Sequence, residues 1–514
     1  MEYALPLLPG NKAAVSFPGA LPLLAALTPE GHSITILDEN IDTIDFERLR
    51  TFDVVGVTGM IVQKRRIMEI LSEVSGRGPI VCVGGPYVTV EEQYLAGLCD
   101  VVFHGEADET WPEFIDDVAY GRPIKARYAQ ATPTDMSKLP CPRYDLVQTG
   151  RYLTATTQFS RGCPYLCEFC DIIVIFGRKP RLKAEDQIIA ELDSLLRVGV
   201  RAVFFVDDNF IGNKAKAKSL LSAIVQWQER NGYKMTFSTE ATINVADDPE
   251  LLQLLRRAKF ASVFIGIESP RSASLIETRK LQNTRGDSLE AKVARIQSAG
   301  IIVQAGLIVG FDHDDALIFD EQFHFLQLTG IGAPFVSILS PIPTTPLYER
   351  LQREGRLTLD DELVWFEPKG MSKQQLKNGY SELNSRIYAA DAFFARIFTQ
   401  LSRQGARNRR PLGLFARGVA LSAALGTARR LLWQATKHQK FSVGLAYLAA
   451  LCRNILLGEN GLSWLEFFSL CARHWHCYRV AELGRSYWGR SGEPQNSDAP
   501  SGRWRERLEI AQVS

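Results

Sequence analysis

Short apolar runs rich in β-branched residues alternate with stretches of helical spacing in the first quarter of the chain. The runs at 32–37, 53–58, 80–83 and 100–103 predict strands, and helices are predicted between them at 21–27, 65–74 and 90–98. This alternation predicts a small doubly wound, Rossmann-like parallel sheet over residues 1–125. The chain starts close to the first predicted helix without a clear opening strand, so a truncated N-terminus remains open.

A second and longer series of the same kind follows a break in periodicity at 126–148, where Pro133, Pro140 and Pro142 are typical of a linker. Over residues 149–370, strands are predicted at 153–159, 202–206, 235–240, 262–267, 301–309 and 335–339, with helical stretches between them. Six strand–helix units in series predict a partial (β/α)6 barrel. Its active site is expected at the carboxyl ends of the strands.

The remaining segment, 371–514, has helical spacing and ends after Tyr487 in a Gly/Ser/Pro tail that predicts disorder. The net charge of the whole chain is +1, yet from residue 371 onward 21 Lys and Arg face only 9 Asp and Glu. This basic segment also carries aromatic side chains, namely Trp433, Trp464, Phe467, Phe468 and Trp475. Such a composition is typical of contact with a lipidic substrate or an anionic membrane surface. A helical cap buried against the barrel explains it equally well.

The opening residues lack the basic region of a secretory signal, so we expect none, and no uncharged apolar run approaches the ~18 residues that a membrane span requires. The longest such runs, 418–428 and 441–452, are much shorter. We therefore expect a cytoplasmic protein, with peripheral contact at the inner membrane left open. We expect no nucleic-acid partner.

Three of the nine cysteines, Cys163, Cys167 and Cys170, form a C-x₃-C-x₂-C pattern directly after the first predicted barrel strand. In a reducing compartment such crowding predicts metal ligation rather than a disulfide framework. Three thiolates can hold three irons of a [4Fe–4S] cubane and leave the fourth iron open. A structural zinc site normally closes with four ligands, and the nearest following histidine is His313. Zinc and three inert buried cysteines remain the alternatives.

The cysteine pattern and the six-unit barrel together resemble the radical S-adenosylmethionine (SAM) superfamily. The resemblance implies that the open iron binds the amino and carboxylate groups of SAM, whose reductive cleavage yields a 5′-deoxyadenosyl radical. It also implies that Phe169, the aromatic residue before the third cysteine, packs near the adenine. A reductase, flavodoxin or ferredoxin is the expected electron donor.

Carboxylates end the second, third and fourth predicted barrel strands. Asp208, Glu240 and Glu268 occupy these positions, where the family places polar groups near SAM, and we expect all three to bind it. The alternatives are surface ion pairs and, at the second strand, helix capping by Asp207 or Asn209.

A doubly wound domain directly before such a barrel resembles the cobalamin-binding subclass of the superfamily. Gly59, Gly84 and Gly85 follow predicted strands, where glycine lets the backbone approach a corrin, in accord with the crevice at the strand ends of open sheets. A tight turn is the alternative explanation. The Asp-x-His-x-x-Gly signature of cobalt-ligating domains is absent, so no histidine is assigned as the lower ligand of cobalt.

Several segments narrow the resemblance to proteins related to hopanoid C-2 methylases: 167–172, 177–181, 205–213, 238–244, 264–268 and 343–347. The resemblance implies two uses of SAM, one to methylate cobalamin and one to generate the radical. The substrate carbon then loses hydrogen and takes the methyl group from cobalt. We therefore expect methylation of an unactivated carbon in a small apolar or lipid substrate, such as a hopanoid at C-2. A radical SAM cyclase or oxidoreductase, and a non-catalytic metal-binding protein, are the competing hypotheses.

Overall fold

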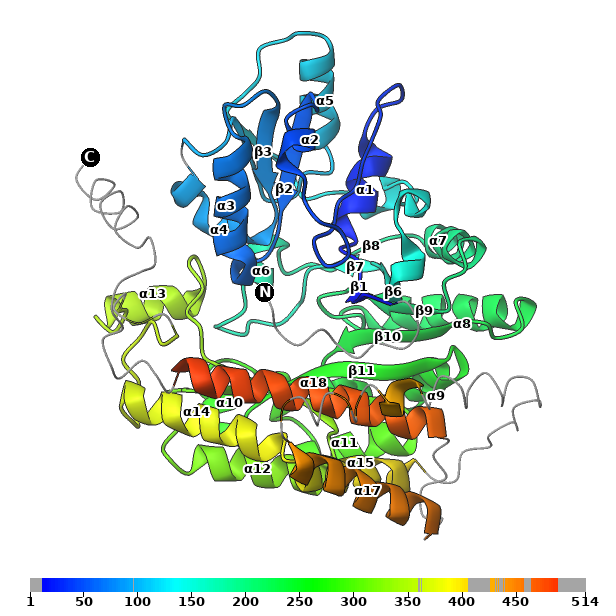
Figure 1. The fold of residues 1–514 in the computed structure, drawn as a ribbon, viewed down its shortest axis with the longest axis vertical. Helices are drawn as coiled ribbons and strands as arrows, with labels where there is room; N and C mark the ends of the chain where they lie inside the picture. Colours follow the sequence, from blue (N-terminus) through cyan, green and yellow to red (C-terminus); the bar gives the residue numbers. More distant parts are fainter. Residues whose placement is uncertain are drawn as a thin grey trace.

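The computed structural model describes residues 12–404, apart from 96, 359, 360 and 362, and several C-terminal segments. Those segments are 426–429, 440–456 and 464–488, together with the single residues 431, 433 and 438. Figure 1 shows a small sheet with its helices above a larger sheet, and a layer of helices from the end of the chain below. The tail predicted after Tyr487 lies almost wholly outside the described residues.

The smaller sheet has four parallel strands in sequence order, β2 (Val54–Thr58), β3 (Ile80–Gly84), β4 (Val101–His104) and β5 (Arg127–Ala129). Val81 and Val83 of β3 pack against α3 (Lys64–Val74) and α4 (Pro86–Glu91), with α2 (Phe46–Leu49) beside them. Cys82 points to the opposite face, which α5 (Thr110–Ala119) covers. Helices on both faces confirm the doubly wound class, as the apolar runs predicted.

One strand prediction in this region is wrong. Residues 32–37 form no strand, although Leu37 packs against the core of the smaller sheet. Ile34, Ile36 and Leu37 are half-buried without strand pairing, and Asp38 at the end of the run accepts a 2.7 Å hydrogen bond from the Tyr152 hydroxyl of the larger sheet. The strand that does precede α1 (Ala20–Leu27) is β1 (Ala14–Ser16), and it pairs with the larger sheet rather than the smaller one.

The larger sheet is entirely parallel, in the order β1-β6-β9-β10-β11-β12-β13. Its last six strands match the six predicted barrel strands: β6 (Tyr152–Thr157), β9 (Ala202–Phe205), β10 (Thr236–Ala241), β11 (Phe260–Glu268), β12 (Ile302–Val309) and β13 (Ala333–Ile338). The partial barrel is thereby confirmed, with β1 as an additional edge strand.

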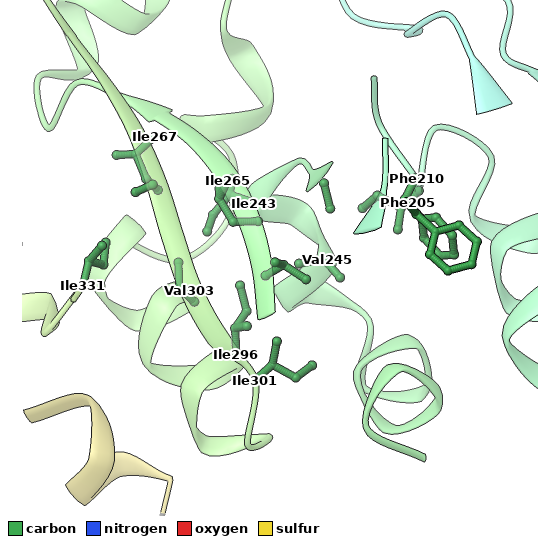
Figure 2. Packing of buried hydrophobic residues seen from close by; sticks show 14 of the residues in the cluster. Phe205, Phe210, Ile243, Val245, Ile265, Ile267, Ile296, Ile301, Val303 and Ile331 are labelled. Atoms are coloured by element: carbon green, nitrogen blue, oxygen red, sulfur yellow. The ribbon is translucent and has the colours of Figure 1, made fainter. Parts of the chain in front are cut away.

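Buried and half-buried residues alternate along these strands, so one face of the sheet is covered by helices and the other is half-open. Ile265, Ile267 and Val303 are buried, and Figure 2 shows them among Ile296 and other apolar side chains of the surrounding elements. The covering helices are α7 (Glu185–Arg197), α8 (Lys214–Arg230), α9 (Pro249–Arg257), α10 (Ser272–Glu277), α11 (Leu289–Ser298) and α12 (Ile318–Thr329). The alternate residues, such as Phe264 and Gly306, are only half-buried, so the opposite face is left for the site.

The C-terminal part is helical, with α13 (Pro346–Arg353), α14 (Lys373–Ile387), α15 (Ala390–Arg403), α17 (Phe441–Leu456) and α18 (Trp464–Trp488). Phe467 and Trp475 are buried with Phe393 and Phe394 in a separate apolar cluster. For Phe467 and Trp475 this burial supports the helical cap. Trp433, in contrast, is 57% exposed. Among the described helices, none combines the length and apolar character that crossing a membrane would require.

Candidate active site

The three cysteines lie in a loop that a short antiparallel ribbon frames. Its strands are β7 (Ser160–Arg161) and β8 (Arg181–Leu182), and α6 (Ile172–Ile175) lies between them in sequence. The amide of Cys163 donates to the carbonyl of Gly177 at 3.2 Å. Gly162 has φ 93°, and a Cβ there would lie 2.9 Å from the same carbonyl oxygen, so only glycine fits. These contacts define the backbone conformation of the loop at its first cysteine.

The chemistry of the cysteines fits an iron–sulfur cluster. Cys167 is buried and the other two are half-buried, and burial raises the pKa of Cys170 to about 12. A thiolate in this setting needs a cationic neighbour such as iron. In the described part of the chain, no three His, Cys, Asp or Glu side chains are arranged around one metal ion. A cubane differs from a single ion because each iron takes its own thiolate, so the three sulfurs need not converge.

Two side-chain amides donate toward the cysteine sulfurs. Asn209 Nδ2 lies 3.8 Å from Cys163 Sγ, and Gln282 Nε2 lies 3.5 Å from Cys167 Sγ. Neither amide belongs to the cysteine motif, and sequence reasoning did not assign them to the cluster. The capping alternative is wrong, because the N-cap of α8 is Asn213, whose side chain accepts from the Lys216 amide at 3.2 Å.

The C-terminal half of the chain also anchors the cysteine loop. The Glu168 amide donates to the Thr278 carbonyl at 2.9 Å, and its carbonyl accepts from Leu347 at 3.0 Å. Its carboxylate accepts from Arg350 Nε at 2.8 Å. Since Glu168 follows Cys167 directly, the start of α13 fixes the middle of the loop.

Asp208 and Glu240 lie at the carboxyl ends of β9 and β10, as predicted. Asp208 Oδ2 accepts from the Gly162 amide at 2.7 Å, beside the first cysteine, and burial raises its pKa to about 6. The Glu240 backbone carbonyl accepts from the Phe210 amide at 2.9 Å, but its carboxylate accepts no hydrogen bond from any residue that the structure describes. Burial, followed by the nearby charge of Asp208, raises its pKa to about 7. Two half-buried carboxyl groups with raised pKa values are suited to meeting a cation.

Glu268 adopts a left-handed backbone conformation, φ 64°, where the register between β11 and β12 shifts. Its Oε1 accepts from Lys280 Nζ at 2.6 Å in a buried ion pair. Burial alone would lower the pKa of Lys280, but Glu268 and the neighbouring Cys167 hold it above its usual value. Lys280 Nζ also lies 5.9 Å from the centre of the Phe169 ring. The structure thus brings Phe169 and Glu268 together through a lysine that the sequence analysis missed.

The predicted glycines lie at one edge of the smaller sheet. Gly59 follows β2, and Gly84 and Gly85 end β3 and begin α4. Gly85 has φ 103°, and a Cβ there would lie 2.4 Å from Thr58 Oγ1. The turn itself therefore requires glycine at this position, so assignment of these three residues to cobalamin stays a prediction.

Comparison with known proteins agrees with this geometry. Residues 157–318 match the radical SAM superfamily, residues 16–115 match the B12 binding domain, and residues 345–483 match a domain of unknown function, DUF4070. A hopanoid C-2 methylase of Rhodopseudomonas palustris is 34% identical over 80% of this chain and 78% of its own length. An uncharacterised methyltransferase of Synechocystis is 40% identical over 76% of this chain and 74% of its own.

The fold is also that of a solved cobalamin-dependent SAM radical enzyme, OxsB with aqua-cobalamin and SAM bound. The TM-score is 0.59 at 16% identity, covering 98% of this chain and 82% of that one. The protein is therefore a radical SAM enzyme with a preceding B12-binding domain, and its cofactors are a [4Fe–4S] cluster, SAM and cobalamin. Within the superfamily, it belongs to the cobalamin-dependent methyltransferase family that includes hopanoid C-2 methylase.

Proposed function

We propose that this enzyme methylates an unactivated carbon of an apolar, ring-containing substrate, specifically a hopanoid lipid at C-2. The similarity to the Rhodopseudomonas palustris hopanoid C-2 methylase carries the proposal. When bound, SAM and cobalamin would supply a carbon-centred radical and a methyl group, chemistry that a substrate without an acidic proton requires. The protein then has to bind the substrate, orient it and exclude water.

The proposal gives the site residues the following roles. Cys163, Cys167 and Cys170 hold the cluster. SAM contacts Phe169, Asp208, Glu240 and Glu268, of which Glu240 has the carboxylate most available to a ligand. Cobalamin lies along the edge of the smaller sheet at Gly59, Gly84 and Gly85.

The half-open face of the larger sheet supports an apolar substrate. Phe264 of β11 and Phe335 of β13 come from the two strands that flank β12. The centres of their rings lie 5.9 Å apart, and Phe335 is 55% exposed. Gly306 is the register partner of Phe335, and a Cβ there would lie 3.1 Å from the Phe264 ring and 4.0 Å from Glu268 Oε2. This aromatic pair and the Glu268 carboxylate therefore share one face of the sheet, so an apolar substrate can lie beside SAM.

The remaining partners are proposed on the same basis. A flavodoxin, ferredoxin or reductase supplies the electron, and the enzyme works in the cytoplasm. Peripheral contact with the inner membrane, through the basic segment from residue 371 onward, would give access to a lipid.

The test is expression in a hopanoid producer that lacks 2-methylated forms, with cobalamin supplied, followed by mass spectrometry of the lipids. We expect a hopanoid heavier by one methyl group at C-2. Phe335→Ala should reduce this product about 10-fold, whereas the control Leu317→Ala, at the exposed N-cap position before α12, should not. Absence of methylated hopanoid with the native chain would reject the substrate, and turnover of a substrate without methyl gain would favour a cyclase or oxidoreductase.

A further inference from the structure

Four charged residues, of which Asp108 and Arg161 are buried and Glu106 and Arg181 half-buried, join the smaller sheet to the ribbon that frames the cysteine loop. Glu106 and Asp108 follow β4, whereas Arg161 and Arg181 belong to β7 and β8. Arg161 Nη1 lies 2.7 Å from Glu106 Oε1 and 2.5 Å from Asp108 Oδ2, and Arg181 Nη1 lies 2.9 Å from Glu106 Oε2. No side chain of the four is more than 16% exposed. We refer to these four residues as the interdomain ion cluster.

The ribbon by itself has an unfavourable arrangement of charge. Arg161 and Arg181 are direct partners across the two antiparallel strands, and like charges in such positions repel. Glu106 accepts hydrogen bonds from both guanidinium groups, and Asp108 accepts two from Arg161. The charge of the two arginines is therefore neutralised by carboxylates that belong to the other domain. The pairing of β7 with β8 thus depends on the contact between the two domains.

The ribbon in turn sets the position of the first cluster ligand. Arg161 is followed by Gly162, whose amide donates to Asp208, and then by Cys163. Arg181 Nη2 donates to the Phe176 carbonyl at 3.1 Å, directly before Gly177, whose carbonyl accepts from Cys163. A shift of Arg161 would therefore reach Cys163 along the chain. A shift of Arg181 would reach Cys163 through its hydrogen bond to Phe176 and the neighbouring Gly177 carbonyl.

The carboxylates of the cluster come from the sheet edge that we assign to cobalamin. β3 and β4 are parallel neighbours, so Gly84, Gly85, Glu106 and Asp108 lie at the same carboxyl edge. The Gly105 amide donates to Thr89 Oγ1 of α4 at 3.1 Å, which fixes the loop before Glu106 to that edge. The loop that carries the acidic pair is thus tied both to the corrin edge and to the iron–sulfur loop.

The ion cluster has no free capacity for a ligand. Its charges balance, Thr134 Oγ1 donates to Asp108 at 2.8 Å, and the Thr134 carbonyl accepts from Arg181 at 2.8 Å. We propose that Glu106, Asp108, Arg161 and Arg181 are positioning residues that set the distance between the [4Fe–4S] cluster and cobalamin. A fixed distance matters because the methyl group carried by one cofactor must meet a substrate radical generated beside the other, and small displacements of reacting groups are costly. This inference rests on the cofactor pair and the proposed corrin edge, and it is independent of the substrate.

The direct test is a distance measurement by pulsed electron paramagnetic resonance between the reduced cluster and cob(II)alamin, both of which are paramagnetic. The variants are Asp108→Asn, which removes one charge at constant shape, and Arg161→Lys, which keeps the charge but loses the two-pronged contact. The matched control is Arg66→Lys, since Arg66 forms a similar 2.7 Å pair with Glu39 on the exposed side of the smaller domain. We expect one narrow distance distribution in the native enzyme and the control, and a shifted or broadened one in both variants. A distribution unchanged from the native enzyme in both variants would overturn the proposal.

A second measurement needs no cofactor. Hydrogen–deuterium exchange of the apoprotein should show about tenfold faster exchange at 101–106 and 160–163 in the two variants than in the native chain, with the control unchanged. If exchange instead rises uniformly along the whole chain, the ion cluster only stabilises the fold and the positioning role is rejected. Neither measurement contains substrate, so a failed hopanoid assignment leaves both results interpretable.

Discussion

The carboxylate of Glu268 holds the ammonium group of Lys280 at 2.6 Å, within the half of the barrel that faces the cysteine loop. Gly266 makes this contact possible, because a Cβ at that position would lie 2.2 Å from Glu268 Oε1 and 2.7 Å from Lys280 Nζ. The lysine in turn lies over Phe169, the residue before the third cysteine. The pair therefore links the end of β11 to the cluster loop.

Removing one member of this pair should cost more than removing both. Lys280→Met leaves a buried carboxylate unpaired and should lower the free energy of unfolding by about 3–5 kcal/mol. The double variant E268Q/K280M leaves no buried charge and should recover at least half of that loss. Denaturant unfolding of the two single variants and the double variant gives the coupling energy. Simple additivity of the two single effects would contradict the ion pair.

The Glu268 carboxylate should also contribute to the affinity of the enzyme for SAM. Glu268→Gln should retain full iron content but weaken SAM binding about 10-fold, because the charge of a proposed ligand contact is lost. Equilibrium binding of SAM to the reconstituted enzyme measures this, with iron content as the control. Native SAM affinity in this variant would return Glu268 to a purely structural role.

Replacing Cys163, Cys167 or Cys170 by Ala should abolish both the cluster and the formation of 5′-deoxyadenosine. Cys141→Ala is the control, because Cys141 is exposed and lies outside the loop. Iron and sulfide analysis together with chromatography of the SAM products checks both properties. Full iron content with normal SAM cleavage in all three variants would exclude the cluster assignment.

The six barrel strands and the cysteine loop were predictable because each rests on a local signal. A buried parallel strand shows as a short apolar run, and the cysteine pattern lies within eight residues. The strand predicted at 32–37 was wrong for the same reason, because this stretch has the same apolar signal but forms no strand, and Leu37 is only partly buried against the core of the smaller sheet. An apolar pattern is a property of the segment itself, whereas strand formation also requires a second strand that pairs with it.

Lys280, Gln282 and the interdomain ion cluster had no such signal. Gln282 is 115 positions from Cys167 in sequence, and Arg161 is 53 positions from Asp108. A single charged or amide residue at such a separation looks like a surface residue until the fold brings its partner near. Arg181 illustrates this, because it lies in a basic stretch of sequence, yet its side chain is only 16% exposed.

Gln282 should tune the reduction potential of the cluster. Its amide donates toward Cys167 Sγ, and a donor to a cluster thiolate stabilises the more electron-rich, reduced state. Gln282→Leu should therefore lower the reduction potential and slow SAM cleavage by a weak reductant about 10-fold. Potentiometric titration followed by electron paramagnetic resonance measures the potential. An unchanged or higher potential in this variant would show that the amide does not act on the cluster.

The pH dependence of stability should identify Glu240 as an unsatisfied carboxyl group. Burial, and secondarily the charge of Asp208, raises its pKa from 4.5 to about 7, so the folded protein favours the neutral form. Its contribution to stability is therefore lost as the pH rises from about 4.5 through about 7. Glu240→Gln removes this effect, and in the absence of SAM it should raise the free energy of unfolding at pH 8 by roughly 2 kcal/mol, allowing for partial exposure to solvent. At pH 4 the variant and the native chain should be about equally stable.

The ionisation of Glu240 should also make SAM affinity depend on pH, in the opposite direction to stability. A positively charged group beside Glu240 favours the carboxylate, so SAM affinity should rise with pH up to about 7, by as much as about tenfold per pH unit. Glu240→Gln should flatten this component, while ionisation of SAM itself and of Asp208 remains in both proteins. The control is Glu250→Gln, because Glu250 is 68% exposed and pairs with Lys218 on the outer helices. Calorimetric binding curves from pH 5 to 8 distinguish the outcomes, and identical pH profiles for the native enzyme and Glu240→Gln would remove Glu240 from the SAM site.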